Sequence, residues 1–330
     1  MKKLFLTYIV FLALFITYDS NSQSIFSKKA LLMGSDFEIT IVEKNESQAN
    51  YLLDLAIEEI SRIEKLISSW NKSSQTSQIN LNAGIRPIKV DKELFDLISR
   101  SLKVSGLSQG AFDISYASLD KVWYFDKEML KVPSEEEIKT SVSKVGFGNI
   151  ILDKKKQTVF LKKKGMKIGF GAIGKGYAAD MAKFLLLKNN VKSGIINASG
   201  DLTAWGGKPS GEDWMVAIVN PLDKDKIFSW LPIKNKAVVT SGNYERFINF
   251  NGKMYSHIID PRTGYPSEGV LSVTIFAEQA ELADALATSV YVLGEEIGMN
   301  LINQLKGIDC IIINDKNKII KSKNIKIEKI

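Results

Sequence analysis

The chain has 330 residues, a formal net charge of +7, and ordinary shares of apolar (45%) and charged (25%) residues. This composition argues against an intrinsically disordered chain and allows a hydrophobic core of normal size. The lysines lie in short clusters that aromatic residues do not interrupt. We therefore interpret them as solvated faces and expect no nucleic-acid partner.

The first residues have the pattern of a secretory signal peptide. Lys2 and Lys3 precede an apolar run over residues 4–17, and polar residues follow it. The run is short for a membrane span, although an uncleaved anchor is the alternative. We expect cleavage near Gln23, which divides the chain into a signal peptide (1–23) and one folded unit (24–330). The protein is then exported, to the periplasm or the outer face of the cytoplasmic membrane.

The single cysteine, Cys310, lies in the apolar run Ile308–Ile313. We interpret it as a buried core thiol and not as a nucleophile. One cysteine cannot form a disulfide within the chain. Since no cysteine directly follows the signal segment, we expect no lipid anchor there.

Periodicity and turn residues predict the elements of the chain in order. The first half is predicted to contain a strand, a helix, a polar loop, two helices and a strand, at Asp36–Val42, Ser47–Ser68, Asn71–Asn82, Lys92–Ser105, Ser134–Lys144 and Thr158–Leu161. The second half is predicted to contain a helix from the turn Gly169–Gly176 to Asn190, strands at Gly194–Ala198, Trp214–Val219 and Val270–Phe276, helices at Ala280–Leu293 and Glu295–Leu305 separated at Gly294, and a hairpin of Cys310–Ile313 with Lys318–Lys321. Helices and strands do not alternate strictly, which favours an α+β fold.

The glycine-rich segment Gly169–Gly176 matches two nucleotide motifs incompletely. It satisfies G-x-G-x-x-G, but no acidic residue lies at the distance that a dinucleotide site needs. It also approaches the phosphate-loop pattern, but Gly176 stands where that pattern has serine or threonine. A tight turn without a ligand is the alternative. Glycines nevertheless allow close approach of a ligand, and Lys175 at a helix start favours a phosphate.

Two further patterns in the last third suggest chemistry. His257 is the only histidine, and it precedes a turn with Asp260-Pro261, where side chains often face a cleft. Its ordinary pKa suits a general base that acts on a hydroxyl group. Asp284 and Thr288 are four residues apart on a predicted helix, so their oxygens share one face and suit Mg²⁺. A structural histidine and an ordinary surface pair are the alternatives.

Taken together, these segments resemble the ApbE family of FAD:protein FMN transferases over nearly all of the chain after the signal. The resemblance rests on segments that occur in the family's order: Met33-Gly34, Ile67–Trp70, Ser77–Asn80, Gly110–Asp113, Gly171–Asp180, Asn197–Asp201, Thr240–Arg246, His257–Gly264 and Ala283–Thr288. It implies an ApbE-like (T-fold-like) α+β fold of mixed helices and antiparallel sheets. It also implies an enzyme that uses Mg²⁺ to attach FMN from FAD to a threonine or serine hydroxyl as a phosphoester, releasing AMP.

The resemblance also implies roles for single residues. Mg²⁺ would be held by Asp284, Thr288 and the backbone carbonyl of Ala172, and the catalytic residues would be His257, as the base, and Lys175. FAD contacts would include Met33, Trp70, Ala111, Phe112, Asp113, Lys175, His257 and Ile258. The acceptor would be a flavoprotein subunit of a membrane redox complex.

The chain departs from the family pattern at two positions. Gly169 stands where an aspartate is usual, and Ser199 where glycine is usual. The first departure puts one cofactor or metal contact in question. It leaves open an enzyme that hydrolyses FAD to FMN and AMP, or a flavin-binding module without catalysis. A nicotinamide-dependent dehydrogenase is the weakest alternative, because the fold context for it is missing.

Overall fold

The structure is a computed structural model that describes residues 23–125, 129, 131–220, 223–242, 247–250 and 253–325. Its centre is an eight-stranded sheet in the order β1-β2-β6-β7-β10-β13-β14-β15. Every neighbouring pair in this sheet is antiparallel. The strands are β1 Ser24–Leu32, β2 Ser35–Glu43, β6 Gly194–Ala198, β7 Asp201–Trp205, β10 Lys236–Gly242, β13 Val270–Ala277, β14 Asp309–Asn314 and β15 Ile319–Lys321.

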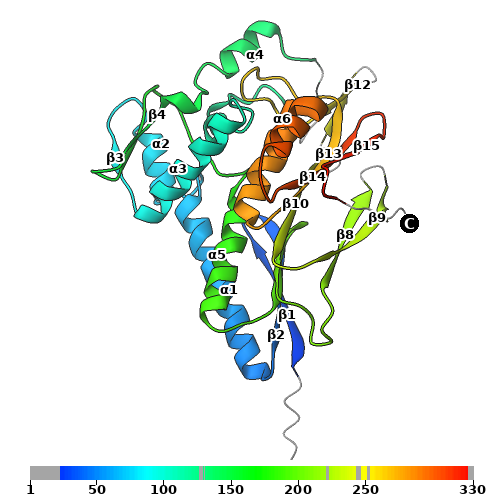
Figure 1. Cartoon of the computed structure of the whole chain (residues 1–330). Helices are drawn as coiled ribbons and strands as arrows, with labels where there is room; N and C mark the ends of the chain where they lie inside the picture. The colour runs from blue at the N-terminus through cyan, green and yellow to red at the C-terminus, as the bar shows by residue number, and fades with distance from the viewer. Residues whose placement is uncertain are drawn as a thin grey trace, which may run out of the picture.

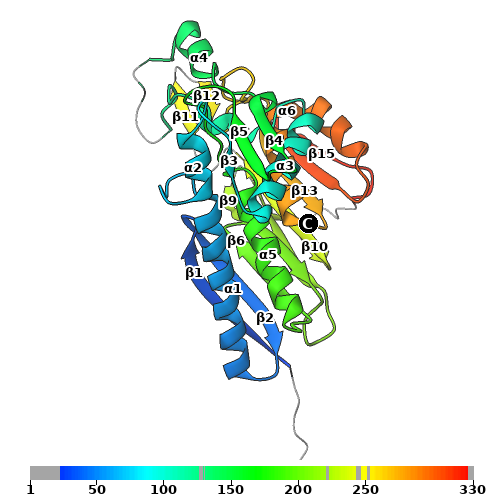
Figure 2. The ribbon, with the colours of Figure 1, turned by 90° about the vertical axis from the view of Figure 1, so that its left-hand side faces the viewer.

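Three long helices cover one face of this sheet: α1 Glu46–Ile67, α5 Gly174–Lys188 and α6 Ala280–Asn303 (Figures 1 and 2). The α5 helix packs against both α1 and α6. The apolar face of α1 forms because its buried residues recur every three or four positions, and the Asn45 side chain caps its start by accepting the Gln48 N–H at 3.0 Å. These helices and the inner face of the sheet make the main core.

The opposite face of the sheet carries a hairpin of β8 Trp214–Asn220 and β9 Asp223–Ile233. Trp214, Val216 and Ile233 form a second apolar cluster with sheet residues that include Val238 and Phe276. The sheet is therefore covered on both faces, and all eight residues of β13 are buried.

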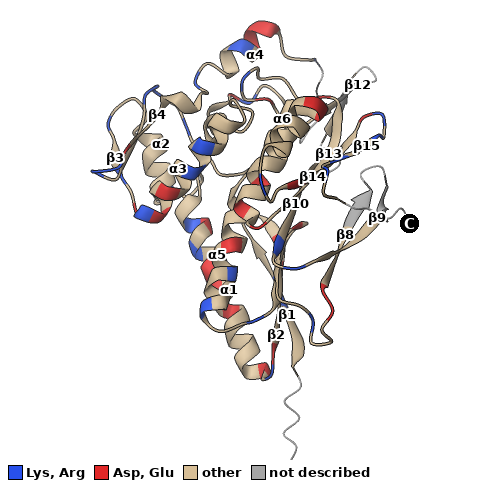
Figure 3. Ribbon diagram, viewed as in Figure 1, with Lys and Arg blue, Asp and Glu red and all other residues tan. Residues whose placement is uncertain are grey.

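Shorter elements gather at one end of the sheet and helices (Figure 1). They are α2 Gln75–Leu81, β3 Ile88–Lys89, α3 Lys92–Leu107, η1 Ile114–Ser118, α4 Glu135–Ser141, η2 Phe147–Asn149, β4 Ile150–Asp153 and β5 Thr158–Leu161, with the hairpin β11 Phe247–Phe250 and β12 Lys253–Ser256. Ser134 and Glu137 form the predicted capping box of α4. Along α1 and α5, acidic and basic residues are interspersed on the face that Figure 3 shows.

The α+β expectation and the predicted helices are confirmed, with one correction in a segment that we expected to be a loop. Within Asn71–Asn82, residues Gln75–Leu81 form a helix because the Ser74 hydroxyl caps it, accepting the Ser77 N–H at 2.9 Å. Thr76, Ser77 and Ile79 are buried by this helix. The interruption at Gly294 is confirmed, since its φ of 80° is not helical.

The predictions for the ends of the chain have different outcomes. Cys310 is fully buried, as expected. Residues 1–22 of the predicted signal peptide lie outside the described residues, and so do Asn243–Arg246 of one motif. Among the described residues, no helix combines the length and apolarity that a membrane crossing requires.

Candidate active site

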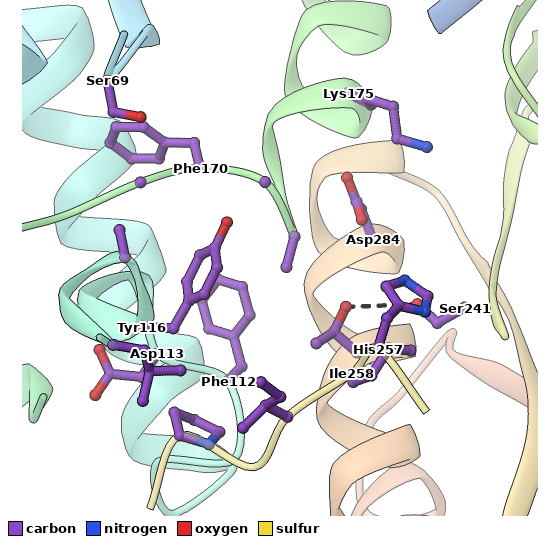
Figure 4. Close-up of a pocket in the computed structure, with 18 of the residues that line it drawn as sticks. Ser69, Phe112, Asp113, Tyr116, Phe170, Lys175, Ser241, His257, Ile258 and Asp284 are labelled. Atoms are coloured by element: carbon purple, nitrogen blue, oxygen red, sulfur yellow. Dashed lines mark hydrogen bonds between the residues drawn. The ribbon is translucent and has the colours of Figure 1, made fainter. Parts of the chain in front are cut away.

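A cavity of about 1030 Å³ brings together almost all of the predicted site residues (Figure 4). Ten of them line it: Trp70, Ala111, Phe112, Asp113, Ala172, Lys175, His257, Ile258, Asp284 and Thr288. Met33 instead lines an adjoining pocket of about 580 Å³. Trp70 and Lys175 line both pockets, so the two pockets share part of their walls.

The glycine turn before α5 is required by packing. A Cβ atom at Gly176 would overlap the carbonyl oxygen of Ala280, and one at Gly174 would lie 2.9 Å from the Ile67 side chain. The glycines therefore let the start of α5 approach α6 and α1 closely. No strand precedes the turn at Lys167-Ile168, unlike in a dinucleotide-binding fold.

The start of α6 is held by a half-buried carboxylate from α5. Asp180 accepts the backbone N–H groups of Ala280 at 3.0 Å and Glu281 at 2.9 Å. Burial raises the pKa of Asp180 to about 6, although these two hydrogen bonds oppose the shift. Asp180 thus orients the helix that carries Asp284 and Thr288.

Asp284 and Thr288 lie one turn apart on α6 and both line the cavity, as the i, i+4 spacing predicted. Asp284 is buried, and its carboxylate accepts the Gly176 N–H at 3.2 Å. The Thr288 hydroxyl lies 3.4 Å from that of Ser241 on β10, the contact that Figure 4 marks with a dashed line.

The charges around Asp284 favour an additional cation. Burial raises the pKa of Asp284, the neighbouring Asp201 raises it further, and Lys175 lowers it. Lys175 forms an ion pair with Asp201, with nitrogen and oxygen 2.5 Å apart. The positive charge of one lysine therefore compensates two buried carboxylates.

The oxygens at this place fit Mg²⁺, which prefers oxygen ligands and keeps several waters. Asp284, Thr288 and the Ala172 carbonyl supply an all-oxygen set on the wall of one cavity. Within the part of the chain that the structure describes, no cluster of three or more His, Cys, Asp or Glu side chains suits a metal. Hydroxyl and backbone oxygens must then complete any such site.

His257 is carried by a loop that several hydrogen bonds fix. The Ile258 N–H donates to the Ser256 hydroxyl at 3.1 Å, and the Asp260 carbonyl accepts from Thr263 and Gly264. The Trp123 ring N–H donates to the Gly264 carbonyl at 2.9 Å. Figure 4 shows the imidazole on the same side of the cavity as Asp284 and Ser241. This position suits a base that acts on a group entering the cavity.

Two of the predicted flavin contacts have contrasting surroundings. Asp113 is buried, and its two carboxylate oxygens accept the N–H groups of Ser115 and Phe147, each at 2.7 Å. It therefore orders the chain around η1 whatever else it contacts. Trp70 is 92% exposed, so its ring is available to a ligand. Both residues remain predicted contacts.

Three of the cavity-lining residues that were not predicted from the sequence are Asp201, Ser241 and Tyr116. Asp201 lies in a recognised segment, but its pairing with Lys175 depends on tertiary structure. Ser241 lies in another such segment, and Tyr116 lies in none. At Gly169, a Cβ atom would lie 3.1 Å from the Cβ of Ala117, so this wall is closely packed without a side chain.

Comparison with known proteins gives one consistent result. The model of the ApbE family matches residues 33–312. A Klebsiella pneumoniae protein named FAD:protein FMN transferase is 32% identical over 300 residues, which cover 90% of this chain and 92% of the relative. A Treponema pallidum protein of the same name is 30% identical over 304 residues, covering 87% and 84%. The crystal structure of the ApbE protein from Thermotoga maritima superposes with a TM-score of 0.83 at 30% identity, covering 91% of this chain and 97% of that one.

Proposed function

Because the chain belongs to the ApbE family, we propose that it is an FAD:protein FMN transferase, which moves FMN from FAD to a hydroxyl group of another protein. One observation carries the proposal. A single cavity contains a histidine, a lysine, a buried carboxylate with a hydroxyl one turn away, and aromatic residues. A flavin needs apolar walls, and its diphosphate needs charge and hydrogen-bond donors.

In the proposed reaction, the hydroxyl oxygen of an acceptor threonine or serine attacks the phosphorus of the FMN half of FAD. A new phosphorus–oxygen bond forms while the bond to the AMP phosphate breaks, so that AMP leaves. His257 takes the proton of the attacking hydroxyl. Lys175 stabilises the negative charge of the departing phosphate. The product is a phosphoester between FMN and the acceptor.

We propose Mg²⁺ as the metal, held by Asp284, Thr288 and the carbonyl of Ala172. Support comes from the oxygen donors on one wall and from the raised pKa of Asp284. When bound, the ion would neutralise charge on the diphosphate. Because the Asp284 side chain is buried, the orientation of its carboxylate is restricted. The ion pair with Asp201 holds Lys175 close to this carboxylate.

We also propose that the protein acts after export, in the periplasm or on the outer face of the cytoplasmic membrane. The basic and apolar pattern of residues 1–23 supports this location. The acceptor would be a flavoprotein subunit of a membrane redox complex.

The test incubates the chain from residue 24 onward with FAD, Mg²⁺ and an acceptor domain that has an exposed threonine. AMP release is measured, and a fluorescent acceptor band is sought on a denaturing gel. We expect both signals, and we expect His257→Ala to lose both. AMP without a labelled band would favour an FAD hydrolase. Bound FAD without AMP would favour a binding module and contradict the proposal.

A further inference from the structure

Two apolar side chains on the cavity wall are exposed to solvent. Trp70 is 92% exposed and Leu81, at the end of α2, is 64% exposed, yet both line the cavity. Exposed apolar side chains that adjoin a site commonly mark a protein contact. The proposed reaction requires such a contact, because the attacking hydroxyl belongs to another protein.

Three exposed lysines also lie on the cavity wall. Lys72, Lys121 and Lys167 are exposed and line the cavity. Neither Lys72 nor Lys167 forms an ion pair with a carboxylate of the described residues. The nitrogen of Lys121 lies 5.2 Å from the centre of the Tyr124 ring.

Among the described residues that line the cavity, the one exposed carboxylate is paired and the other carboxylates are buried. Asp120 is an exposed carboxylate on the cavity wall, and both of its oxygens lie 3.0 Å from the Lys144 nitrogen. The other carboxylates that line the cavity, Asp113, Asp201 and Asp284, are buried. Among the described wall residues, the charges nearest to solvent are therefore mainly positive.

We infer that Lys72, Lys121, Lys167 and Leu81, which we name the lysine rim, dock the acceptor through acidic residues next to the modified threonine or serine. This inference rests on the proposed function, which supplies the need for a protein substrate. The acidic residues of the acceptor pair with the lysines, and apolar residues beside them cover Leu81. Complementary charge would mainly increase the rate of association and the selectivity for the correct partner.

The test uses two synthetic threonine peptides that differ only in having aspartates or asparagines next to the threonine. Binding to the chain from residue 24 onward, with FAD and Mg²⁺ present, is followed by fluorescence anisotropy. We expect the aspartate peptide to bind at least about tenfold more tightly, with a preference that weakens as salt is added. Equal binding of the two peptides would overturn the inference.

Two charge-reversal double variants test which lysines cause the preference for the aspartate peptide. Lys72→Glu with Lys167→Glu should abolish the preference for the aspartate peptide. Lys154→Glu with Lys155→Glu, on the exposed turn between β4 and β5, should leave it intact. Thermal melting checks that both variants fold. An equal loss in both variants, or an intact preference in the rim variant, would refute the role of the rim.

Measuring FAD binding and AMP release distinguishes this inference from a role of the lysines in FAD binding and from a failure of the transferase proposal. Flavin fluorescence should give the same affinity for FAD in the wild type and in the rim variant. A large loss of FAD affinity with an unchanged peptide preference would assign the lysines to the diphosphate and overturn the inference. A wild type that prefers the aspartate peptide but releases no AMP would refute the transferase proposal and leave the rim as a binding site.

Discussion

The hydroxyl oxygen of Tyr116 lies where a side chain at Gly171 would begin. A Cβ atom built on Gly171 would overlap this oxygen, which also accepts a hydrogen bond from the Gly171 N–H. The next residue is Ala172, whose carbonyl is a predicted metal ligand. Tyr116 and Gly171 therefore hold this part of the cavity wall together.

We predict that Gly171→Ala lowers the free energy of unfolding by about 1–3 kcal/mol, because the new methyl group displaces the Tyr116 hydroxyl. Combining it with Tyr116→Phe should recover part of this loss, since the oxygen is then absent. Urea unfolding of the four chains in this cycle measures the coupling.

Gly106→Ala is the matched control for this cycle. Gly106 lies in α3, and a Cβ atom there would meet no atom within 4 Å. Its free energy of unfolding should be unchanged or slightly higher, since alanine favours a helix. An equal effect of Gly171→Ala with and without the Tyr116 hydroxyl would show that the contact is unimportant.

We predict that Asp284→Asn stabilises the metal-free protein while removing its activity. At pH 8 the wild type must hold an ionised carboxylate in a buried position near Asp201, whereas the amide is neutral. The melting temperature without metal should rise, and Mg²⁺-dependent AMP release should fall on the order of 100-fold or more.

The control for Asp284 is Asp315→Asn, which changes an exposed carboxylate and should alter neither quantity. Mg²⁺ should raise the melting temperature of the wild type and of this control, but not that of Asp284→Asn. If Mg²⁺ still raised the melting temperature of Asp284→Asn, Asp284 would not be a ligand of the metal.

Asp180 should make stability depend on pH. Its pKa in the folded chain, about 6, exceeds the ordinary value of about 3.9, so the folded chain binds this proton more tightly. The stability from protonation is full below about pH 4 and is lost as the pH rises through about 6. Relative to Asp180→Asn, the wild type should therefore lose up to about 3 kcal/mol between these limits. Urea unfolding at several pH values measures the difference, and parallel curves would contradict it.

The ion pair between α3 and α6 should contribute more than an exposed pair does. Arg100 donates to both oxygens of Glu281, at 2.6 and 2.9 Å, and the Glu281 side chain is only 11% exposed. We expect Glu281→Gln to lower the free energy of unfolding by about 1–3 kcal/mol. Asp96→Asn breaks the exposed pair with Lys92 on the same helix and should cost less than about 0.5 kcal/mol. Chemical denaturation compares the two, and equal losses would contradict the prediction.

The helices of this fold were predictable because local signals define them. The α1 helix has a regular apolar face and an asparagine cap, and α6 is interrupted at Gly294. The β1 strand was missed because it lies at the edge of the sheet and most of its residues are partly or fully exposed. The α2 helix was missed because its polar residues Thr76 and Ser77 are buried by tertiary packing.

The candidate site was predictable as a set of segments but not as a set of contacts. The motifs identified Lys175 and Asp284, and the cavity contains both. The pairing of Lys175 with Asp201, from β7, depends on how α5 lies against the sheet. Tyr116 was not identified because its role depends on a contact with Gly171, 55 positions along the chain.

Among the described residues, the eight-stranded sheet is open, and no strand pairs with the outer side of β1 or of β15. Such edges can recruit strands from other molecules and start aggregation. Two features of the chain oppose this. Lys28 and Lys29 place charge in the middle of β1, and β15 has only three residues, the last of which is Lys321. Replacing the β1 lysines by apolar residues would therefore reduce solubility without touching the cavity.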